Sequence, residues 1–87
     1  MIAEQIRRQV TIELTQCVSS KDVLRTFAEA DSDFLGKRVP IYRRQEVLQE
    51  IKSNLDILLP KTENVQLVRE GRLMIDSLLS KYKLTDS

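Results

Sequence analysis

The sequence predicts an all-α fold, a compact four-helix bundle that forms a single helical domain over residues 1–87. The chain contains only two glycines and two prolines, whereas an all-β fold needs turn residues about every eight to twelve positions. Apolar residues also recur three and four positions apart along most of the chain, which is the spacing of an amphipathic helix. With 87 residues, the chain can enclose one small core and no second one.

The first helix is expected over residues 2–18. Its apolar residues share a sector of roughly 160° on a helical wheel, and only Ile12 lies outside that sector. The sector contains Ile2, Ala3, Ile6, Val10, Leu14, Cys17 and Val18. A strand over residues 9–15 is the alternative, because apolar and polar residues alternate there and β-branched side chains are frequent. That strand would make the fold α+β.

The second helix is expected over residues 20–35. Ser19 and Asp22 have the spacing of a capping box, with Asp in place of Glu or Gln. Gly36 stands where a left-handed residue often closes a helix. The apolar residues of this helix share one side: Val23, Leu24, Phe27, Ala28, Ala30, Phe34 and Leu35.

The third helix is expected over residues 41–59. Pro40 suits the start of a helix because its φ is fixed near the helical value, and Pro60 cannot continue one. Apolar residues spaced three and four apart form a stripe between them: Val47, Leu48, Ile51, Leu55, Leu58 and Leu59.

The fourth helix is expected over residues 63–83, with Thr62 as its N-cap. Apolar residues occupy one half of its helical wheel and charged residues the other. A hairpin over residues 64–75 that turns at Glu70 and Gly71 is the alternative. On the helical wheel, Gly71 lies near the centre of the apolar face, which indicates either a close helix crossing or a tolerated glycine that costs about 1 kcal/mol relative to alanine.

The chain has no histidine, which removes the commonest general base, the commonest metal ligand and the usual partner of a Ser or Cys nucleophile. The single cysteine, Cys17, lies on the apolar side of the first helix and is expected to be a buried structural thiol. We therefore predict a protein that is not an enzyme, with no catalytic residues, no metal site, no cofactor and no small-molecule substrate.

The most distinctive local feature is a group of cations around one aromatic residue. These candidate residues for binding an anion or a charged partner are Lys37, Arg38, Tyr42, Arg43 and Arg44. Cations in the first turn of a helix oppose its dipole, so they are not expected to stabilise the third helix. Guanidinium groups beside free backbone N–H groups suit phosphate or a carboxylate-rich partner. The alternative is a solvated basic loop that pairs with the acidic residues just upstream.

Ile57 and Leu73 lie off the apolar stripes and are candidates for apolar contact with a partner. We predict a non-enzymatic protein-interaction module of the adaptor, inhibitor or chaperone type, which binds a protein partner or a second copy of itself through helix faces. The alternative is a small dimeric nucleic-acid-binding regulator that uses residues 37–44. Against it, a net charge of +1 gives little long-range attraction for nucleic acid.

A cytoplasmic location and no membrane contact are expected. No apolar run is longer than residues 57–59, and a membrane-spanning helix needs about 20 apolar residues. The first eight residues include Glu4, Arg7 and Arg8 in place of the apolar stretch of a signal peptide. A lone cysteine also fits a reducing compartment.

Overall fold

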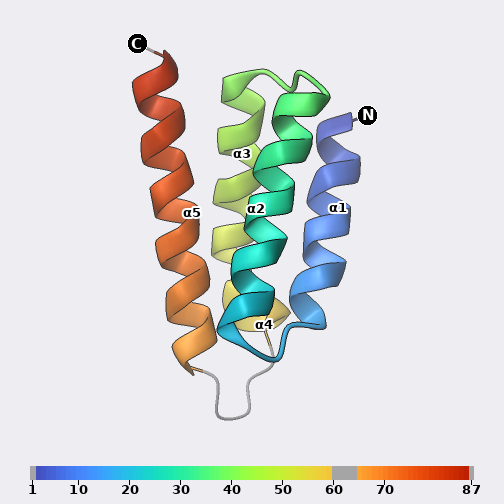
Figure 1. The fold of residues 1–87 in the computed structure, drawn as a ribbon, viewed down its shortest axis with the longest axis vertical. Helices are drawn as coiled ribbons and strands as arrows, with labels where there is room; N and C mark the ends of the chain where they lie inside the picture. The colour runs from blue at the N-terminus through green and yellow to red at the C-terminus, as the bar shows by residue number, and fades with distance from the viewer. Residues whose placement is uncertain (1, 60–64, 87) are drawn as a thin grey trace.

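The computed structural model describes residues 2–59 and 65–86 and is drawn in Figure 1. Its helices, in chain order, are α1 (Ile2–Thr15), α2 (Ser20–Gly36), α3 (Ile41–Ser53), α4 (Leu55–Leu58) and α5 (Val65–Asp86). The predicted all-α bundle is confirmed.

The two β alternatives are wrong. Residues 9–15, the alternative strand, lie within α1. Residues 65–75, which make up the described part of the alternative hairpin, lie within α5. No strand occurs anywhere in the described ranges, so the helical periodicity of the apolar residues decided the structure of both segments.

The four long helices occupy the corners of the bundle. α1 packs against α2 and α3, and α5 packs against the same two helices, so α2 and α3 stand on one diagonal and α1 and α5 on the other. In Figure 1, α1 and α3 run away from the end that holds the N-terminus, and α2 and α5 run back toward it. The connection between α2 and α3 therefore crosses that end of the bundle diagonally.

The core is one cluster of side chains to which every helix contributes. Its largest fully buried members are Tyr82, Phe27, Phe34, Leu14, Leu48, Ile51, Leu55, Leu59, Ile75 and Val23. Phe34 and Tyr82 meet edge to face, with ring centroids 6.4 Å apart. Burial of each large apolar side chain stabilises the fold by about 1.5–3 kcal/mol.

α1 ends at Thr15 rather than at residue 18. Its last turn tightens, because the N–H groups of Gln16 and Cys17 donate to carbonyl oxygens three residues earlier, at 3.0 and 3.2 Å. Cys17 still enters the core, but Val18, which the helical wheel placed on the apolar face, is 76% exposed.

α2 begins where the capping box predicts, at Ser20. The Ser19 hydroxyl accepts a hydrogen bond from the N–H of Asp22 at 3.4 Å, and the Asp22 carboxylate accepts one from the N–H of Val18 at 3.1 Å. These bonds satisfy N–H groups at the helix start. The bond from Val18 is the main cause that holds the pKa of Asp22 below its usual value.

The prediction of one continuous helix over residues 41–59 is wrong, because the helix is interrupted at Asn54. The side chains of Ser53 and Asn54 donate to backbone carbonyl oxygens one turn earlier, at 3.1 and 2.9 Å. Such bonds compete with the helical ladder and bend helices. The remaining turn is α4, and Leu55 anchors it in the core.

α5 continues to Asp86, past the predicted end at residue 83. Its described part begins at Val65, and the predicted start at residue 63, the Thr62 cap and the Pro60 stop all lie outside the described residues.

Gly71 lies at a close contact between α5 and α4. It is buried, and a Cβ atom there would lie 3.4 Å from Cδ2 of Leu55. A methyl group would therefore make ordinary van der Waals contact, whereas a larger side chain would displace Leu55. Gly71 therefore lies at a helix contact, as the helical wheel indicates, but the expectation that no side chain would fit there is wrong, because the contact leaves room for a methyl group.

Candidate functional site

The chain reverses direction at Arg38, just after α2. Arg38 has a φ of 55°, in the left-handed region that glycine adopts most readily. The N–H of Val39 donates to the Phe34 carbonyl at 2.9 Å, and the N–H of Arg38 donates to the Leu35 carbonyl at 3.1 Å. This is a Schellman motif with Arg38 in the usual glycine position. The prediction of a left-handed residue at Gly36 is wrong, since Gly36 stays helical.

Packing explains the position of the reversal. Val39 and Phe34 are both buried in the core cluster, as expected of the apolar pair that accompanies this motif. A reversal at Gly36 would carry Val39 away from that position. Burial of Val39 thus outweighs the local cost of the left-handed backbone at Arg38.

The α2–α3 connection and the start of α1 form a groove of about 320 Å³ at this end of the bundle. We call it the end groove, and its lining residues are Ile2, Ala3, Lys37, Arg38, Val39, Pro40, Tyr42 and Arg43. Ala3 and Val39 are buried and belong to its floor, whereas Tyr42 is 64% exposed. Four of the five residues predicted to bind a charged partner therefore line one groove. Sequence reasoning missed the contribution of α1.

The cations of the end groove are Lys37, Arg38 and Arg43. Lys37 and Arg38 are exposed, and neither forms a salt bridge with a carboxylate of the residues that the structure describes. Arg43 pairs with Glu46, one helical turn later, at 3.3 Å. The expected pairing with upstream acidic residues therefore does not occur for Lys37 and Arg38.

Arg44 differs from the other cations because it points inward. Its Nε donates to the Val39 carbonyl at 2.7 Å, and its Nη2 donates to the Phe34 carbonyl at 3.4 Å. Its guanidinium carbon lies 5.3 Å from the centre of the Tyr82 ring, within the range of a cation–π contact. Arg44 thus ties the α2–α3 connection to α5 rather than lining the end groove.

A second set of contacts joins α2 to α5 beside Arg44. The Tyr82 hydroxyl donates to Oδ1 of Asp31, and Lys81 Nζ donates to Oδ2 of Asp31 at 2.7 Å. Burial raises the pKa of Asp31, but the hydrogen bonds from Lys81 and Tyr82 outweigh burial and hold it below its usual value. Burial, followed by the hydrogen bond to Asp31, raises the pKa of Tyr82. These contacts brace the elements that carry the end groove.

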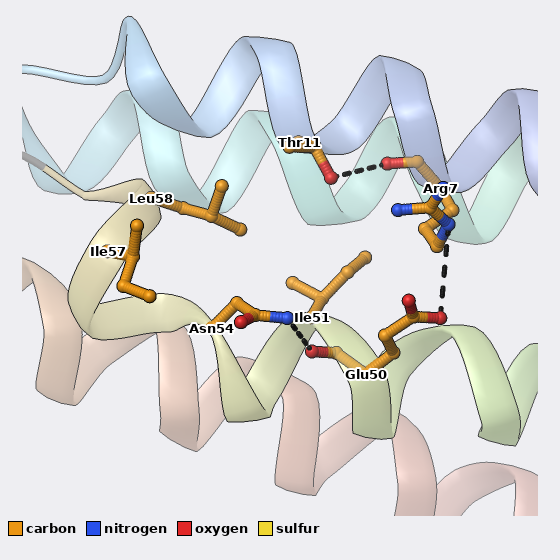
Figure 2. Close-up of a pocket in the computed structure, with 7 residues that line it drawn as sticks. All are labelled: Arg7, Thr11, Glu50, Ile51, Asn54, Ile57 and Leu58. Carbon is orange, nitrogen blue, oxygen red and sulfur yellow. Dashed lines mark hydrogen bonds and ion pairs between the residues drawn. The ribbon is translucent and has the colours of Figure 1, made fainter.

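Ile57 lies at a smaller pocket, of about 120 Å³, between α1 and the α3–α4 segment (Figure 2). Arg7 and Glu50 approach each other there, with Nε and Oε2 3.9 Å apart. Arg7 also pairs with Glu4, so the cation at this pocket is already paired within the chain. Ile57 itself is 74% exposed.

Leu73 lies at a groove of about 280 Å³ between α2 and α5, on the side of the bundle opposite Ile57. We call it the side groove, and its lining residues are Ser20, Val23, Leu24, Glu70, Leu73 and Met74. The structure therefore does not bring Ile57 and Leu73 into one surface. Sequence reasoning placed Leu24 with the core-facing residues, but it is 55% exposed.

Cys17 is a buried thiol, as predicted. Its Sγ donates to the Glu13 carbonyl at 3.3 Å and lies 3.7 Å from Oγ1 of Thr26. Burial is the main cause that raises the pKa of Cys17, so the thiol stays protonated at neutral pH.

The arrangement of α2 and α3 differs from two common DNA-binding motifs, the helix-turn-helix and the ribbon-helix-helix. The two helices are antiparallel on a diagonal of the bundle, whereas the helices of a helix-turn-helix cross at about 90–120°. A ribbon-helix-helix would need a strand where α1 lies. The cations of the end groove are therefore presented by a loop and a helix start at the end of a bundle.

Comparison with known proteins adds no relative: no family model, curated protein or solved structure matches the chain. In the part of the chain that the structure describes, no helix has an apolar stretch long enough to cross a bilayer.

Proposed function

We propose that the chain is a non-enzymatic protein-interaction module, and that its end groove docks a segment of a partner protein in which acidic residues flank an apolar or aromatic anchor. One observation carries the proposal. The groove combines an apolar floor with two cations, Lys37 and Arg38, that have no salt bridge among the described residues.

The apolar and charged side chains of the groove have different tasks. Ile2 and Tyr42 offer exposed apolar area, and covering such area contributes about 25 cal/mol per Å² before the costs of association. Lys37 and Arg38 select an acidic segment, because they repel a basic one. Since the net charge of the chain is only +1, this attraction acts close to the groove.

The backbone at Arg38 supports a role for its side chain. A residue other than glycine in the left-handed region costs about 1–3 kcal/mol, and such conformations cluster at functional sites. Glycine would relieve that cost but would remove a cation from the rim of the groove. An arginine at this left-handed position therefore supports recognition of an anionic partner.

Fluorescence anisotropy with three labelled peptides tests the proposal. The first peptide, Glu-Asp-Leu-Phe-Asp-Glu, places acidic residues around an apolar anchor. The second has Ser-Ser in place of Leu-Phe, and the third has amides in place of all the acids. We expect the first peptide to bind about tenfold more tightly than either of the others, and its affinity to fall as salt is added.

Variants locate the binding site. Tyr42→Ser removes the exposed ring, and the double variant Lys37→Gln with Arg38→Gln removes the cations. Each should weaken binding of the first peptide about tenfold. Ile12→Ser is the matched control, because Ile12 is 53% exposed on α1 and lines none of the grooves described above. Unchanged affinity in the end-groove variants would overturn the proposal.

Nucleic acid is the competing occupant. Binding of duplex DNA is measured at about 50 mM salt. If DNA binds more tightly than the first peptide, and if the Lys37 and Arg38 double variant weakens that binding, the occupant of the end groove is nucleic acid instead of a peptide. The end-of-bundle geometry, in which α3 packs between α1 and α5, favours the peptide.

A reducing compartment such as the cytoplasm suits this module, because Cys17 is a buried free thiol and disulfides persist mainly in oxidising compartments. A second copy of the chain is the remaining alternative partner. Sedimentation equilibrium that shows a dimer, dissociated by Tyr42→Ser, would assign the end groove to self-association instead.

A further inference from the structure

The side groove between α2 and α5 is an apolar surface that the end groove does not explain. Val23 is fully buried at its base, Met74 is half-buried, and Leu24 and Leu73 at its rims are 55% and 63% exposed. Apolar side chains gathered along a groove, rather than scattered singly, are typical of a binding surface.

Two cations, Lys21 and Arg69, do not line the side groove, but each lies one helical turn from a leucine at its rim. Lys21 lies one helical turn before Leu24 on α2, and Arg69 lies one turn before Leu73 on α5, so each cation shares a helix face with an exposed leucine. Because α2 and α5 run in the same direction (Figure 1), both cations lie toward the same end of the groove. Neither has a salt bridge within residues 2–59 and 65–84.

Glu70 is the anion of the side groove, and the chain itself holds it. A hydrogen bond with Ser20 and one from Gln66 Nε2, at 3.1 Å, lower the pKa of Glu70, so it is ionised at neutral pH. Lys21 and Arg69 together exceed this single negative charge. The cationic end of the groove therefore complements acidic residues on an occupant.

We propose that the side groove is a second docking site, and that its occupant is an amphipathic helix of a partner protein. The apolar face of that helix lies in the groove, and its acidic residues lie beside Lys21 and Arg69. Two parallel helices form the walls, and apolar side chains spaced three and four residues apart form a ridge that packs between such walls. A lysine-rich amphipathic helix would be repelled by the same two cations.

The second site is separate from the end groove. Within the part of the chain that the structure describes, the two grooves share no lining residue. The end groove lies at the C-terminal end of α2, whereas the side groove begins at its first residue, Ser20. The chain can therefore hold two segments at once, which is how an adaptor connects partners.

The probe for the side groove is a labelled peptide of about 16 residues, with leucines at three- and four-residue spacing and glutamates elsewhere. A second peptide carries lysines in place of the glutamates. We expect the acidic helix to bind and the basic helix to bind at least about tenfold more weakly. A basic helix that binds as well as the acidic one would overturn the proposed charge selection.

Leu24→Ser and Leu73→Ser should each weaken the acidic helix about fivefold or more. Ile57→Ser is the matched control, because Ile57 is a more exposed apolar residue, at 74%, on the opposite side of the bundle. Far-UV circular dichroism verifies that each variant stays helical. Equal affinity in Leu73→Ser and Ile57→Ser would overturn the proposal.

The charged variant tests the orientation of the helix. Lys21→Gln with Arg69→Gln should weaken the acidic helix and remove its advantage over the basic one. If that advantage is kept, the cations do not select the occupant and the proposal fails. A dimer seen by sedimentation and dissociated by Leu73→Ser, but not by Ile57→Ser, would replace the partner helix with a second copy of the chain.

Simultaneous binding distinguishes this inference from the proposed function. Tyr42→Ser should affect only the end-groove peptide, and Leu73→Ser only the acidic helix. If saturating end-groove peptide displaces the acidic helix, the sites are not separate and the adaptor inference is overturned. Failure of the end-groove peptide to bind would leave the helix experiment unaffected, since it uses another probe and other residues.

Discussion

The end groove and the side groove are built in different ways from the same bundle. The end groove stands on a loop and two helix starts, with Arg38 in a left-handed conformation. The side groove stands on two regular helices and needs no unusual backbone. The first therefore depends on the side chains that brace the loop, above all Arg44, and the second depends on the packing of α2 against α5. Substitutions can thus alter one groove and spare the other.

Arg44→Ala should have the largest effect. It removes the donor to two backbone carbonyl oxygens and the cation over the Tyr82 ring, so the free energy of unfolding should fall by about 2–3 kcal/mol in urea denaturation. The end-groove peptide should bind more weakly, and the acidic helix should bind as before. Arg43→Ala is the control, because its exposed ion pair contributes less than about 1 kcal/mol. If both variants lose the same small amount of unfolding free energy, Arg44 does not brace the loop.

Asp31→Asn tests the link between α2 and α5, with an expected cost of about 1–2 kcal/mol at pH 7. The pKa of Asp31 is lowered in the folded chain relative to about 3.9 in an unfolded one. Its stabilisation is therefore fully present above that unfolded value and is lost as the pH falls through the folded-state pKa. The difference between wild type and variant should therefore shrink as the pH falls below the unfolded-state value. A difference that stays constant from neutral pH to acid pH well below the unfolded-state value would exclude this origin.

Arg38→Gly should separate stability from binding at the end groove. Glycine adopts a positive φ without strain, so the free energy of unfolding should rise by about 0.5–1 kcal/mol, while the acidic peptide binds more weakly because a cation is lost. Lys37→Gly is the matched control. Lys37 has a φ of −97°, so glycine there should lower stability by about 0.5–1 kcal/mol. Thermal unfolding of the two variants should shift in opposite directions.

Glu70→Gln should have the smallest effect on stability, within about 0.5 kcal/mol, because the side chain is near the surface. Among the described residues, it removes the one carboxylate that lines the side groove, so the acidic helix should bind about two- to fivefold more tightly. Glu46→Gln, on the other side of the bundle, should leave that affinity unchanged. Anisotropy titrations measure both, and weaker binding to Glu70→Gln would contradict the charge argument.

The spacing of apolar residues predicted the bundle because each long helix buries one stripe of side chains. The predictions fail where side-chain hydrogen bonds or long-range packing determine the backbone conformation. At Asn54, hydrogen bonds from the Ser53 and Asn54 side chains to the backbone interrupt the helix. The adjacent polar residues could have predicted this interruption. At Arg38 the reversal depends on burial of Val39, which no local pattern reveals.

The end groove could be predicted only in part from the sequence. Lys37, Arg38 and Arg43 are neighbours in the sequence, so their common location follows from the chain itself. The inward direction of Arg44 was also predictable, because Arg44 lies four residues before Leu48, on the apolar stripe of α3. The contribution of Ile2 was not, since only the packing of α1 brings it to the groove.

The diagonal connection between α2 and α3 divides the bundle into two helical hairpins, α1–α2 and α3–α5. Each hairpin joins elements close in sequence and can close early in folding, whereas the parallel contacts of α1 with α3 and of α2 with α5 form only when the hairpins dock. The side groove lies along one of these late-forming contacts, the one between α2 and α5. A helix bound there would contact both hairpins and stabilise their docked state by mass action. A bound partner helix would therefore stabilise the bundle as well as dock on it. Slower amide hydrogen exchange in α2 and α5 would detect that stabilisation.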